Sequence, residues 1–425
     1  MFSLAYKRYA LAVMTTVCTF NLLDRGLMIM LLQPIKEDLR LSDTQIGFVT
    51  GIAFGLFYAT LGVPIARWAD RGNRVTITSL AIGLWGLTVM ACLFVTSYAQ
   101  LVLARIAAAV GESGGRPPTY SLIGDYFPEP AERTRAMYVS DAAGPLATLA
   151  SFMLAGWLNE LYGWRVAFFL IGIPGLLLAI LIKWTLVEPR MRASAARQQS
   201  RPAPPMKAVL AILWRQRSCR HLTLAMILIW TMSAGLGPWY AAFMIRTHGM
   251  GTAELGVWFG LIFGLSGIAG LLLGGYVVCH WFSGNERGQM RMSAVTIALV
   301  VPFFVAFLLL PEKHLALIAL IPLTMVLTSF LPAVLALLQR LVPDDMRATS
   351  LAVVLLLANL IGMGLGPQVV GILSDLLTPI LGTEGLRYAM LIVSFLGLWA
   401  GCHLWWAGHT INEDLSLRLK PICLK

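Results

Sequence analysis

The chain has 425 residues, of which 58% are hydrophobic and only 12% are charged, whereas ordinary soluble domains carry roughly a quarter charged residues. This composition predicts that lipid surrounds most of the folded surface. The formal charge of +11 does not indicate a nucleic-acid-binding protein, because Lys and Arg lie between the apolar blocks and form no basic domain of their own.

The six cysteines lie mostly inside or at the ends of apolar segments, without pairs or metal-ligand spacing. They predict neither a disulfide framework nor a zinc site, and we expect no metal and no bound cofactor. At the N-terminus no short apolar segment ends in a cleavage site, so the first segment is expected to remain as a spanning helix.

A bilayer core of about 30 Å requires about 20 apolar residues per helix. The sequence therefore predicts an all-α membrane protein with twelve transmembrane helices. The predicted spans are 10–34, 46–68, 75–96, 98–123, 136–160, 165–187, 220–244, 254–279, 291–310, 315–338, 347–373 and 386–408. A membrane β-barrel is excluded, because alternating ten-residue segments are absent.

The longest polar break, residues 189–219, is rich in Arg and Pro and predicts an exposed cytoplasmic linker. It divides the chain into an N-terminal six-helix half (1–188) and a C-terminal half with a short tail (220–425). Most Lys and Arg residues fall in segments on the same side of the membrane as the linker. The positive-inside rule therefore places both termini on the cytoplasmic side of a bacterial-type inner membrane. Because one chain contains both halves, we expect a functional monomer.

Charged residues interrupt two of the predicted spans. The first span contains "NLLDRG", with Asp24 and Arg25, and the span 98–123 contains Arg105, Glu112 and Arg116. Each charge at bilayer depth costs roughly 2.5–3.5 kcal/mol, so such residues usually face a cavity and pair with one another. We expect Asp24 and Arg25 to meet Glu112 and Arg116, and Glu112 and Arg116 have the favourable i, i+4 spacing.

These charges predict a proton-coupled transport site. Desolvation raises the proton affinity of a carboxylate and a nearby Arg lowers it, so a substrate or a conformational change can tip the balance. Glu112 is the first candidate proton carrier and Asp24 the second, and Arg25, Arg105 and Arg116 are the candidate cavity cations. The alternative interpretation is a static ion-pair cluster that holds two helices together.

An enzyme is not expected. "GESGG" at 111–115 fits the G-x-S-x-G pattern of serine hydrolases, but it lies within a membrane helix and lacks the required strand–turn–helix context. A G-x-x-x-x-G-K-[ST] loop is absent, so ATP is not the direct energy source and a proton gradient is expected instead.

The segment "GVPIARWADRGNRV" at 62–75 resembles the loop between helices two and three of the major facilitator superfamily. Together with the twelve spans, the basic central linker and "RIAAAVGE", the resemblance covers the whole chain. It implies the major facilitator fold and a conformational latch formed by Asp70, Arg71 and Arg74. Asp70 would cap a helix near "RATS" at 347–350, and the two Arg residues would pair with acidic groups at nearby cytoplasmic helix ends.

Within that superfamily the chain resembles the Spinster group and its bacterial relatives. The resemblance is carried by "NLLDRG", "LRLSDTQIGFVTGIAFGLFYA", "GESGGRPPTYSLIGDYF" and "GPWYAAFMIRTHGM". It implies proton-linked movement of an amphiphilic molecule or lipid, such as a lysophospholipid or a sphingoid lipid, with membrane lipid as a partner. Arg116 does not belong to the group pattern and equally suits a small organic anion.

The C-terminal half offers candidate cavity-lining residues, because aromatic and amide groups suit an amphiphile's apolar body and polar tip. They are Trp230, Trp239, Tyr240, Asn359 and Gln368. Two alternatives remain open: an uptake symporter for small organic anions, and a non-transporting sensor or receptor on the same fold.

Overall fold

A computed structural model describes residues 2–189, 205–343 and 346–419. Within these ranges the secondary structure is helical and no strand occurs, as the sequence predicts. The chain falls into two compact units, one made of Met1–Gln198 and Pro238–Gly264 and the other of Gln199–Gly237 and Leu265–Lys425. Each unit is described by itself.

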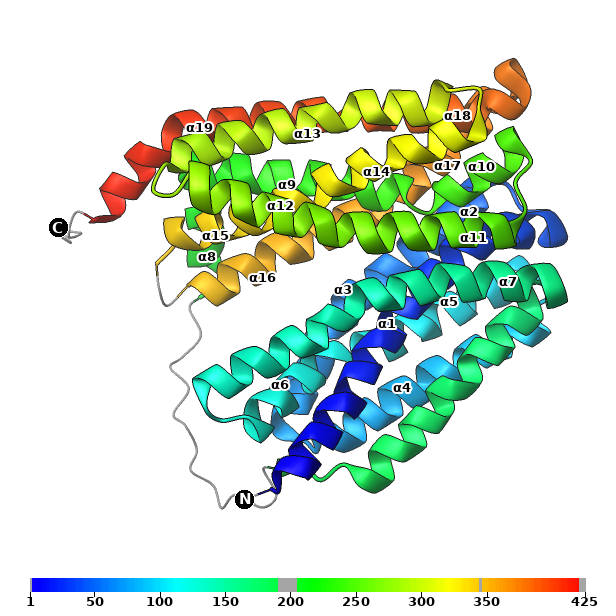
Figure 1. Ribbon diagram of the computed structural model, residues 1–425, viewed down its shortest axis with the longest axis horizontal. Helices are drawn as coiled ribbons and strands as arrows, with labels where there is room; N and C mark the ends of the chain where they lie inside the picture. The colour runs from blue at the N-terminus through cyan, green and yellow to red at the C-terminus, as the bar shows by residue number, and fades with distance from the viewer. Residues whose placement is uncertain (1, 190–204, 344–345, 420–425) are drawn as a thin grey trace. The chain divides into compact units, whose positions relative to one another are not determined.

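The first unit is built around α1 and the long α7, which pack side by side, with α4 and α11 also against α7 (Figure 1). Its helices are α1 (Leu4–Leu39), α2 (Asp43–Thr50), α3 (Ile52–Arg71), α4 (Arg74–Ala91), η1 (Cys92–Phe94), α5 (Tyr98–Ser113), α6 (Arg116–Tyr126), α7 (Pro130–Thr185), α10 (Trp239–His248) and α11 (Thr252–Leu261). Within α7, Gly163 has a φ of 80°, a left-handed conformation that favours glycine, and the chain turns there between two helices.

In the second unit α9 packs against α17 and α19, and α13 packs against α14 and α19. Its helices are α8 (Met206–Arg215), α9 (Arg217–Leu236), α12 (Gly267–Trp281), α13 (Glu286–Leu309), α14 (Lys313–Ser329), α15 (Leu331–Leu341), α16 (Arg347–Leu357), η4 (Ala358–Met363), α17 (Gly364–Leu381), η5 (Gly382–Glu384), α18 (Gly385–Ser394) and α19 (Leu396–Leu419). The π-helical segment η3 (Ile262–Ser266) crosses the boundary between the units.

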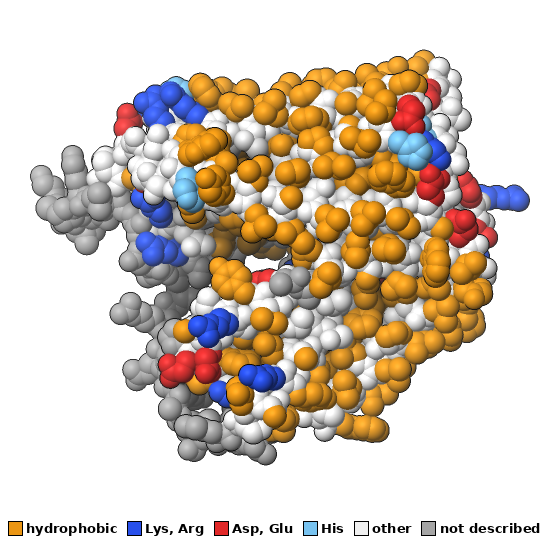
Figure 2. Space-filling model, in the orientation of Figure 1, with side chains coloured by type: hydrophobic (Ala, Val, Ile, Leu, Met, Phe, Trp, Pro, Cys, Tyr) orange, Lys and Arg blue, Asp and Glu red, His pale blue; other side chains and the backbone are white. Residues whose placement is uncertain are grey.

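Nine helical stretches in the described residues are long and apolar enough to cross a membrane. Two of them, of 55 and 68 residues, are long enough for two crossings each, since one crossing takes about 20 residues. Hydrophobic side chains cover much of the face seen in Figure 2. The membrane fold agrees with the prediction, and the exact count of twelve spans stays a prediction.

The grouping of segments into units differs from the division at residues 189–219. Residues 238–264, which the sequence assigns to the C-terminal half, form part of the first compact unit. The physical reason is their packing, because α11 lies along α7 and α10 contacts α1. The two six-helix halves stay a prediction about membrane topology.

A helix break separates the charges that the sequence places on one helix. The segment α5 ends at Ser113, and α6 begins at Arg116 after Gly114 and Gly115. Pro117 lies in the first turn of α6, where a missing N–H costs no helical hydrogen bond. Glu112 and Arg116 therefore lie on different helices.

Close helix packing next to Glu112 is testable. A Cβ atom at Gly111 would lie 2.7 Å from the backbone nitrogen of Trp85 on α4. We expect Gly111→Val to push α5 away from α4 and to lower the stability of the protein by about 1–3 kcal/mol, the range for overpacking. The measurement is the thermal unfolding midpoint in detergent; an unchanged midpoint would contradict the close packing.

Candidate functional site

Two ion pairs connect α1 to α5 inside the first unit. Arg105 Nη1 donates to Asp24 Oδ2 at 2.9 Å, and Arg25 donates to Glu112 Oε1 from Nε at 3.1 Å and from Nη2 at 3.0 Å. Arg105 and Glu112 are seven residues apart, so both lie on the α5 face towards α1. These four residues, Asp24, Arg25, Arg105 and Glu112, are called the α1–α5 layer here. Their formal charges sum to zero, which lowers the free-energy cost of placing them at membrane depth.

The layer is buried except at one side chain. Asp24 is 0% exposed, Glu112 3% and Arg105 5%, whereas the Arg25 side chain is 39% exposed. Arg25 is therefore the member of the layer that an incoming molecule can reach.

Two aromatic rings of α3 cover the cations of this layer. The Arg25 guanidinium lies 5.5 Å from the Tyr58 ring centre, and the Arg105 guanidinium lies 4.8 Å from the Phe54 ring centre. The rings stack on each other at 5.7 Å, as their i, i+4 spacing allows. Cation–π contacts of this kind hold a guanidinium without neutralising it. The sequence analysis missed both rings, although the spacing within "FGLFY" could have indicated them.

Each buried carboxylate keeps one oxygen without a partner. Asp24 Oδ1 and Glu112 Oε2 are buried and make no hydrogen bond to any described residue. A buried acceptor oxygen without a donor is costly, and a bound proton would remove that cost by neutralising the group.

Arg116 does not join the layer, contrary to the expectation that it pairs with Glu112. Among the described residues it makes no ion pair, and its Nε atom is buried without a partner. It lies near Cys18 and Tyr120 instead, close enough to interact electrostatically with both. The helix break at Gly114 and Gly115 is the physical reason. Arg105, two helical turns before Glu112 on α5, supplies the second cation of the site.

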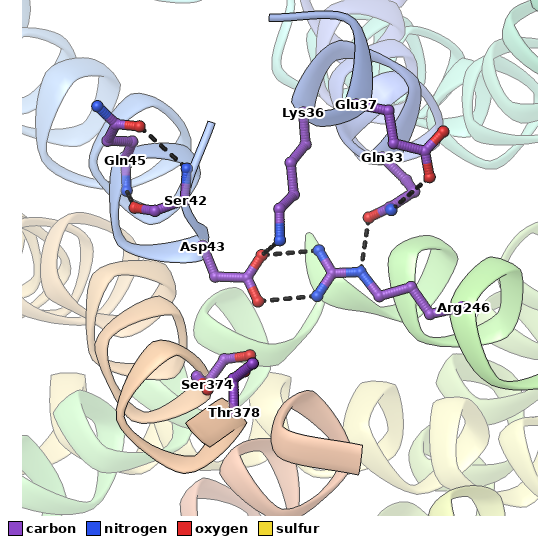
Figure 3. Close-up of polar contacts among 9 residues, drawn as sticks. All are labelled: Gln33, Lys36, Glu37, Ser42, Asp43, Gln45, Arg246, Ser374 and Thr378. Carbon is purple, nitrogen blue, oxygen red and sulfur yellow. Dashed lines mark hydrogen bonds and ion pairs between the residues drawn. The ribbon is translucent and has the colours of Figure 1, made fainter. Parts of the chain in front are cut away.

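A second charged cluster, which the sequence analysis did not single out, lies where α1 ends (Figure 3). Arg246 of α10 binds both oxygens of Asp43, at 2.8 and 2.7 Å, and Lys36 Nζ binds Asp43 Oδ1 at 2.5 Å. Arg246 Nε also donates to Gln33 Oε1 at 2.7 Å. Asp43 is 2% exposed, so this is a buried bidentate pair.

Local structure fixes Asp43 in that cluster. Ser42 and Gln45 form a capping box at the start of α2, which places Asp43 in its first turn. An acidic residue is stabilised there by the helix dipole. The pattern S-D-T-Q in the sequence could have indicated the cap, but the partner on α10 lies 203 residues away in the sequence.

Arg74, one of the three residues of the predicted latch, lies among acidic side chains of the first unit. Its side chain is fully buried, and it contacts Glu188 beyond α7, Asp125 Oδ2 of α6 at 2.6 Å, and Ser121 Oγ at 2.9 Å. The side chains of Asp70 and Arg71 lie outside the described residues. The latch function of all three stays a prediction.

The five candidate cavity-lining residues divide between the two units. Trp230 Nε1 donates to Asn359 Oδ1 at 3.1 Å in the second unit, which also contains Gln368. Trp239 and Tyr240 belong to the first unit and are 0% and 4% exposed, and Tyr240 stacks on Phe263. Whether any of the five lines a substrate cavity stays a prediction.

Known transporters are similar to this chain over most of its length. The chain is 32% identical over 411 residues to an MFS-type efflux pump of Mycolicibacterium smegmatis, covering 96% of this chain and 94% of that protein. It is 23% identical to the hexuronate transporter of Bacillus subtilis over 68% of each chain. A crystal structure of a bacterial homologue of the human lysosomal transporter Spinster, inward-facing and unoccupied, matches with a TM-score of 0.85 and 26% identity over 97% of this chain and 99% of that one.

The family model named Major Facilitator Superfamily matches residues 14–367. The match includes both ion pairs of the α1–α5 layer and the Asp43–Arg246 cluster. The chain therefore belongs to the major facilitator superfamily, is similar to Spinster proteins, and is a multi-pass membrane transporter rather than an enzyme.

Proposed function

We propose that this protein is a proton-coupled secondary transporter that moves an amphiphilic small molecule or lipid by alternating access. The similarity to a Spinster homologue and to an efflux pump extends over nearly the whole chain, and the resemblance to the Spinster group implies an amphiphilic substrate. Fold alone does not determine substrate, so the argument rests on the site.

The proposal rests on two buried carboxylates in the α1–α5 layer, each with one oxygen in an ion pair and the other without a hydrogen-bond partner. Glu112 holds Arg25 with one oxygen and leaves the other free, and Asp24 does the same with Arg105. A proton on Glu112 would neutralise the carboxylate and weaken its hold on Arg25. Because Arg25 is the exposed member of the layer, it would then be free to bind an anionic group of the substrate.

The proposal also covers the oligomeric state, the membrane and the energy source. The protein acts as a monomer in a bacterial-type inner membrane with both termini in the cytoplasm. The proton gradient is the energy source, and no bound cofactor takes part.

The decisive experiment is transport in proteoliposomes with an imposed pH gradient. A labelled lysophospholipid and a labelled small carboxylate are tested side by side. Lipid movement that depends on the gradient supports the proposal, and movement of neither compound with or without the gradient contradicts the transport of these two classes.

A second candidate, uptake of small organic anions, is favoured by Arg116. This cation has no ion-pair partner among the described residues, and the hexuronate transporter is a relative of the chain. If an anion binds there, Arg116→Gln loses about 1.5–3 kcal/mol of binding, the range for a hydrogen bond to a charged group, which raises the KM about ten- to a hundredfold.

The Arg116 prediction is checked by the KM of carboxylate uptake, with Arg67→Gln as an exposed Arg control in the same unit. An unchanged KM in Arg116→Gln would exclude Arg116 as the anion-binding residue.

A further inference from the structure

An apolar groove of about 320 Å³, here called the α13–α19 groove, lies between two helices of the second unit. The two helices run side by side (Figure 1) and approach closely at Gly401, where an added Cβ atom would lie 3.1 Å from the carbonyl oxygen of Ala294. Residues that line the groove include Ala294, Val295 and Ala298 of α13 and Leu398, Cys402 and Trp405 of α19. Val295, Leu398 and Trp405 are exposed, so the groove opens on the outer surface of the unit.

A cation lies at one end of the α13–α19 groove. Arg291 precedes Val295 by four residues, so the two side chains lie on the same face of α13. The Arg291 guanidinium lies 5.1 Å from the ring centre of Trp405, which lines the groove. A cation–π contact holds the guanidinium in place and leaves its charge intact.

The charge of Arg291 is available to a ligand. Among the described residues Arg291 forms no ion pair, and its Nε atom makes no hydrogen bond. Two nearby acidic residues have other partners, because Glu286 pairs with Arg340 at 2.7 Å and Asp414 accepts a backbone N–H of α9 at 2.8 Å. Arg287, one turn before Arg291, adds a second and exposed cation. The groove therefore combines an apolar wall with a basic end.

The basic end lies at the level of lipid headgroups. The 24 residues of α13 span about 36 Å, which exceeds the bilayer core of about 30 Å. Arg291 follows the start of α13 at Glu286 by five residues, or about 7.5 Å, and the groove continues from there along the helix towards Ala298. Trp side chains such as Trp405 are frequent at this boundary between headgroups and hydrocarbon.

We propose that the α13–α19 groove binds an anionic phospholipid of the surrounding leaflet. Its phosphate accepts hydrogen bonds from the Arg291 guanidinium, whose planar fork matches phosphate geometry, and Arg287 adds attraction. One acyl chain lies along the apolar wall between Val295 and Leu398. Basic pockets between membrane helices bind anionic headgroups in this way.

The bound lipid contacts both α13 and α19, so it stabilises the second unit by binding only its folded form. On the orientation proposed above, the lipid belongs to the cytoplasmic leaflet. The proposal adds a lipid site outside the α1–α5 layer, and it does not depend on which substrate is transported.

The first test counts bound lipid by native mass spectrometry of the full chain in detergent. Dioleoylphosphatidylglycerol, which is anionic, and dioleoylphosphatidylcholine, which is zwitterionic, are added separately at equal concentration. We expect one phosphatidylglycerol per chain to be retained in preference to phosphatidylcholine. In Arg291→Gln its Kd is expected to rise about ten- to a hundredfold, the range for a lost hydrogen bond to a charged group.

Arg220→Gln is the matched control for the binding test. Arg220 lies over the ring of Trp214 at 5.9 Å, and Trp214 does not line the groove. The control is expected to retain phosphatidylglycerol like the original protein. Equal retention of the two lipids, or an unchanged Kd in Arg291→Gln, would overturn the proposal. A dimer that forms through this face and excludes the lipid would also overturn it.

The second test is the thermal unfolding midpoint in detergent. Phosphatidylglycerol is expected to raise the midpoint more than phosphatidylcholine does, and Arg291→Gln is expected to lose this difference. Cys402→Phe should lose it too, because Cys402 is exposed and lines the groove, so the larger side chain fills the groove while Arg291 stays in place. Arg291→Lys keeps the charge and is expected to recover part of the difference, which a folding defect would not allow. A full difference in both Arg291→Gln and Cys402→Phe contradicts the site.

Arg25→Gln separates the groove from the proposed transport site. Phosphatidylglycerol binding that is lost in Arg291→Gln and kept in Arg25→Gln supports the groove, whatever the transport assay gives. Binding that is lost in Arg25→Gln and kept in Arg291→Gln contradicts the groove and supports lipid binding at the α1–α5 layer instead.

Discussion

Replacing Glu112 by Gln is expected to abolish accumulation driven by a pH gradient and to leave substrate exchange without a gradient intact. Gln keeps the size and the hydrogen-bonding capacity of the side chain but cannot gain or lose a proton. With one coupled proton, each pH unit supports about tenfold accumulation, which follows from 1.36 kcal/mol per unit. The variant is therefore expected to lose about tenfold accumulation per unit of imposed gradient.

The measurement is the ratio of internal to external substrate in proteoliposomes, taken with and without the gradient. Glu132→Gln is the matched control, because Glu132 forms an exposed ion pair with Lys7 in the same unit. Exposed pairs contribute roughly 0–1 kcal/mol, so this control should accumulate substrate like the original protein. Gradient-dependent accumulation retained in Glu112→Gln would exclude Glu112 as the proton carrier.

The α1–α5 layer shows how much of the candidate site could be predicted from the sequence. Charges within apolar spans are visible in the sequence, because lipid tolerates them only in pairs or cavities, and this argument singled out Asp24, Arg25, Arg105 and Glu112, which form two ion pairs in the structure. The expected meeting of Arg25 with Glu112 is observed, whereas the expected pairing of Glu112 with Arg116 is not. The i, i+4 rule assumes a continuous helix, and the Gly-Gly-Arg-Pro-Pro sequence breaks the helix between Glu112 and Arg116.

Residues 238–264 show what the sequence could not reveal. Hydropathy places them in the second half of the chain, and nothing local indicates that they pack against the first unit. Asp43 and Arg246, which contribute one contact to that packing, look like ordinary loop charges in the sequence. Only the long-range contact makes them a buried bidentate pair. The membrane class and helical fold follow from composition, whereas pairings between distant segments require coordinates.

A substitution at Arg74 distinguishes two roles for this residue, a structural anchor and a conformational latch. If Arg74 is an anchor, its removal takes away the cation that contacts the carboxylates of both Glu188 and Asp125, and the protein loses stability. Removing one partner of a buried pair costs about 3–5 kcal/mol, and Arg74→Gln is expected to lose that amount. If Arg74 is only a latch, the substitution changes the conformational balance and leaves stability unchanged.

Thermal unfolding in detergent distinguishes the two roles of Arg74. We expect a clearly lower midpoint for Arg74→Gln and a change within about 0.5 kcal/mol for Arg67→Gln, an exposed Arg seven residues earlier. Adding Glu188→Gln to Arg74→Gln should recover part of the loss, because the double variant no longer buries a carboxylate that has lost its contact with the Arg74 cation. A midpoint that is unchanged in Arg74→Gln would contradict the anchor role. Arg74 is fully buried and contacts three side chains, so the geometry favours the anchor role.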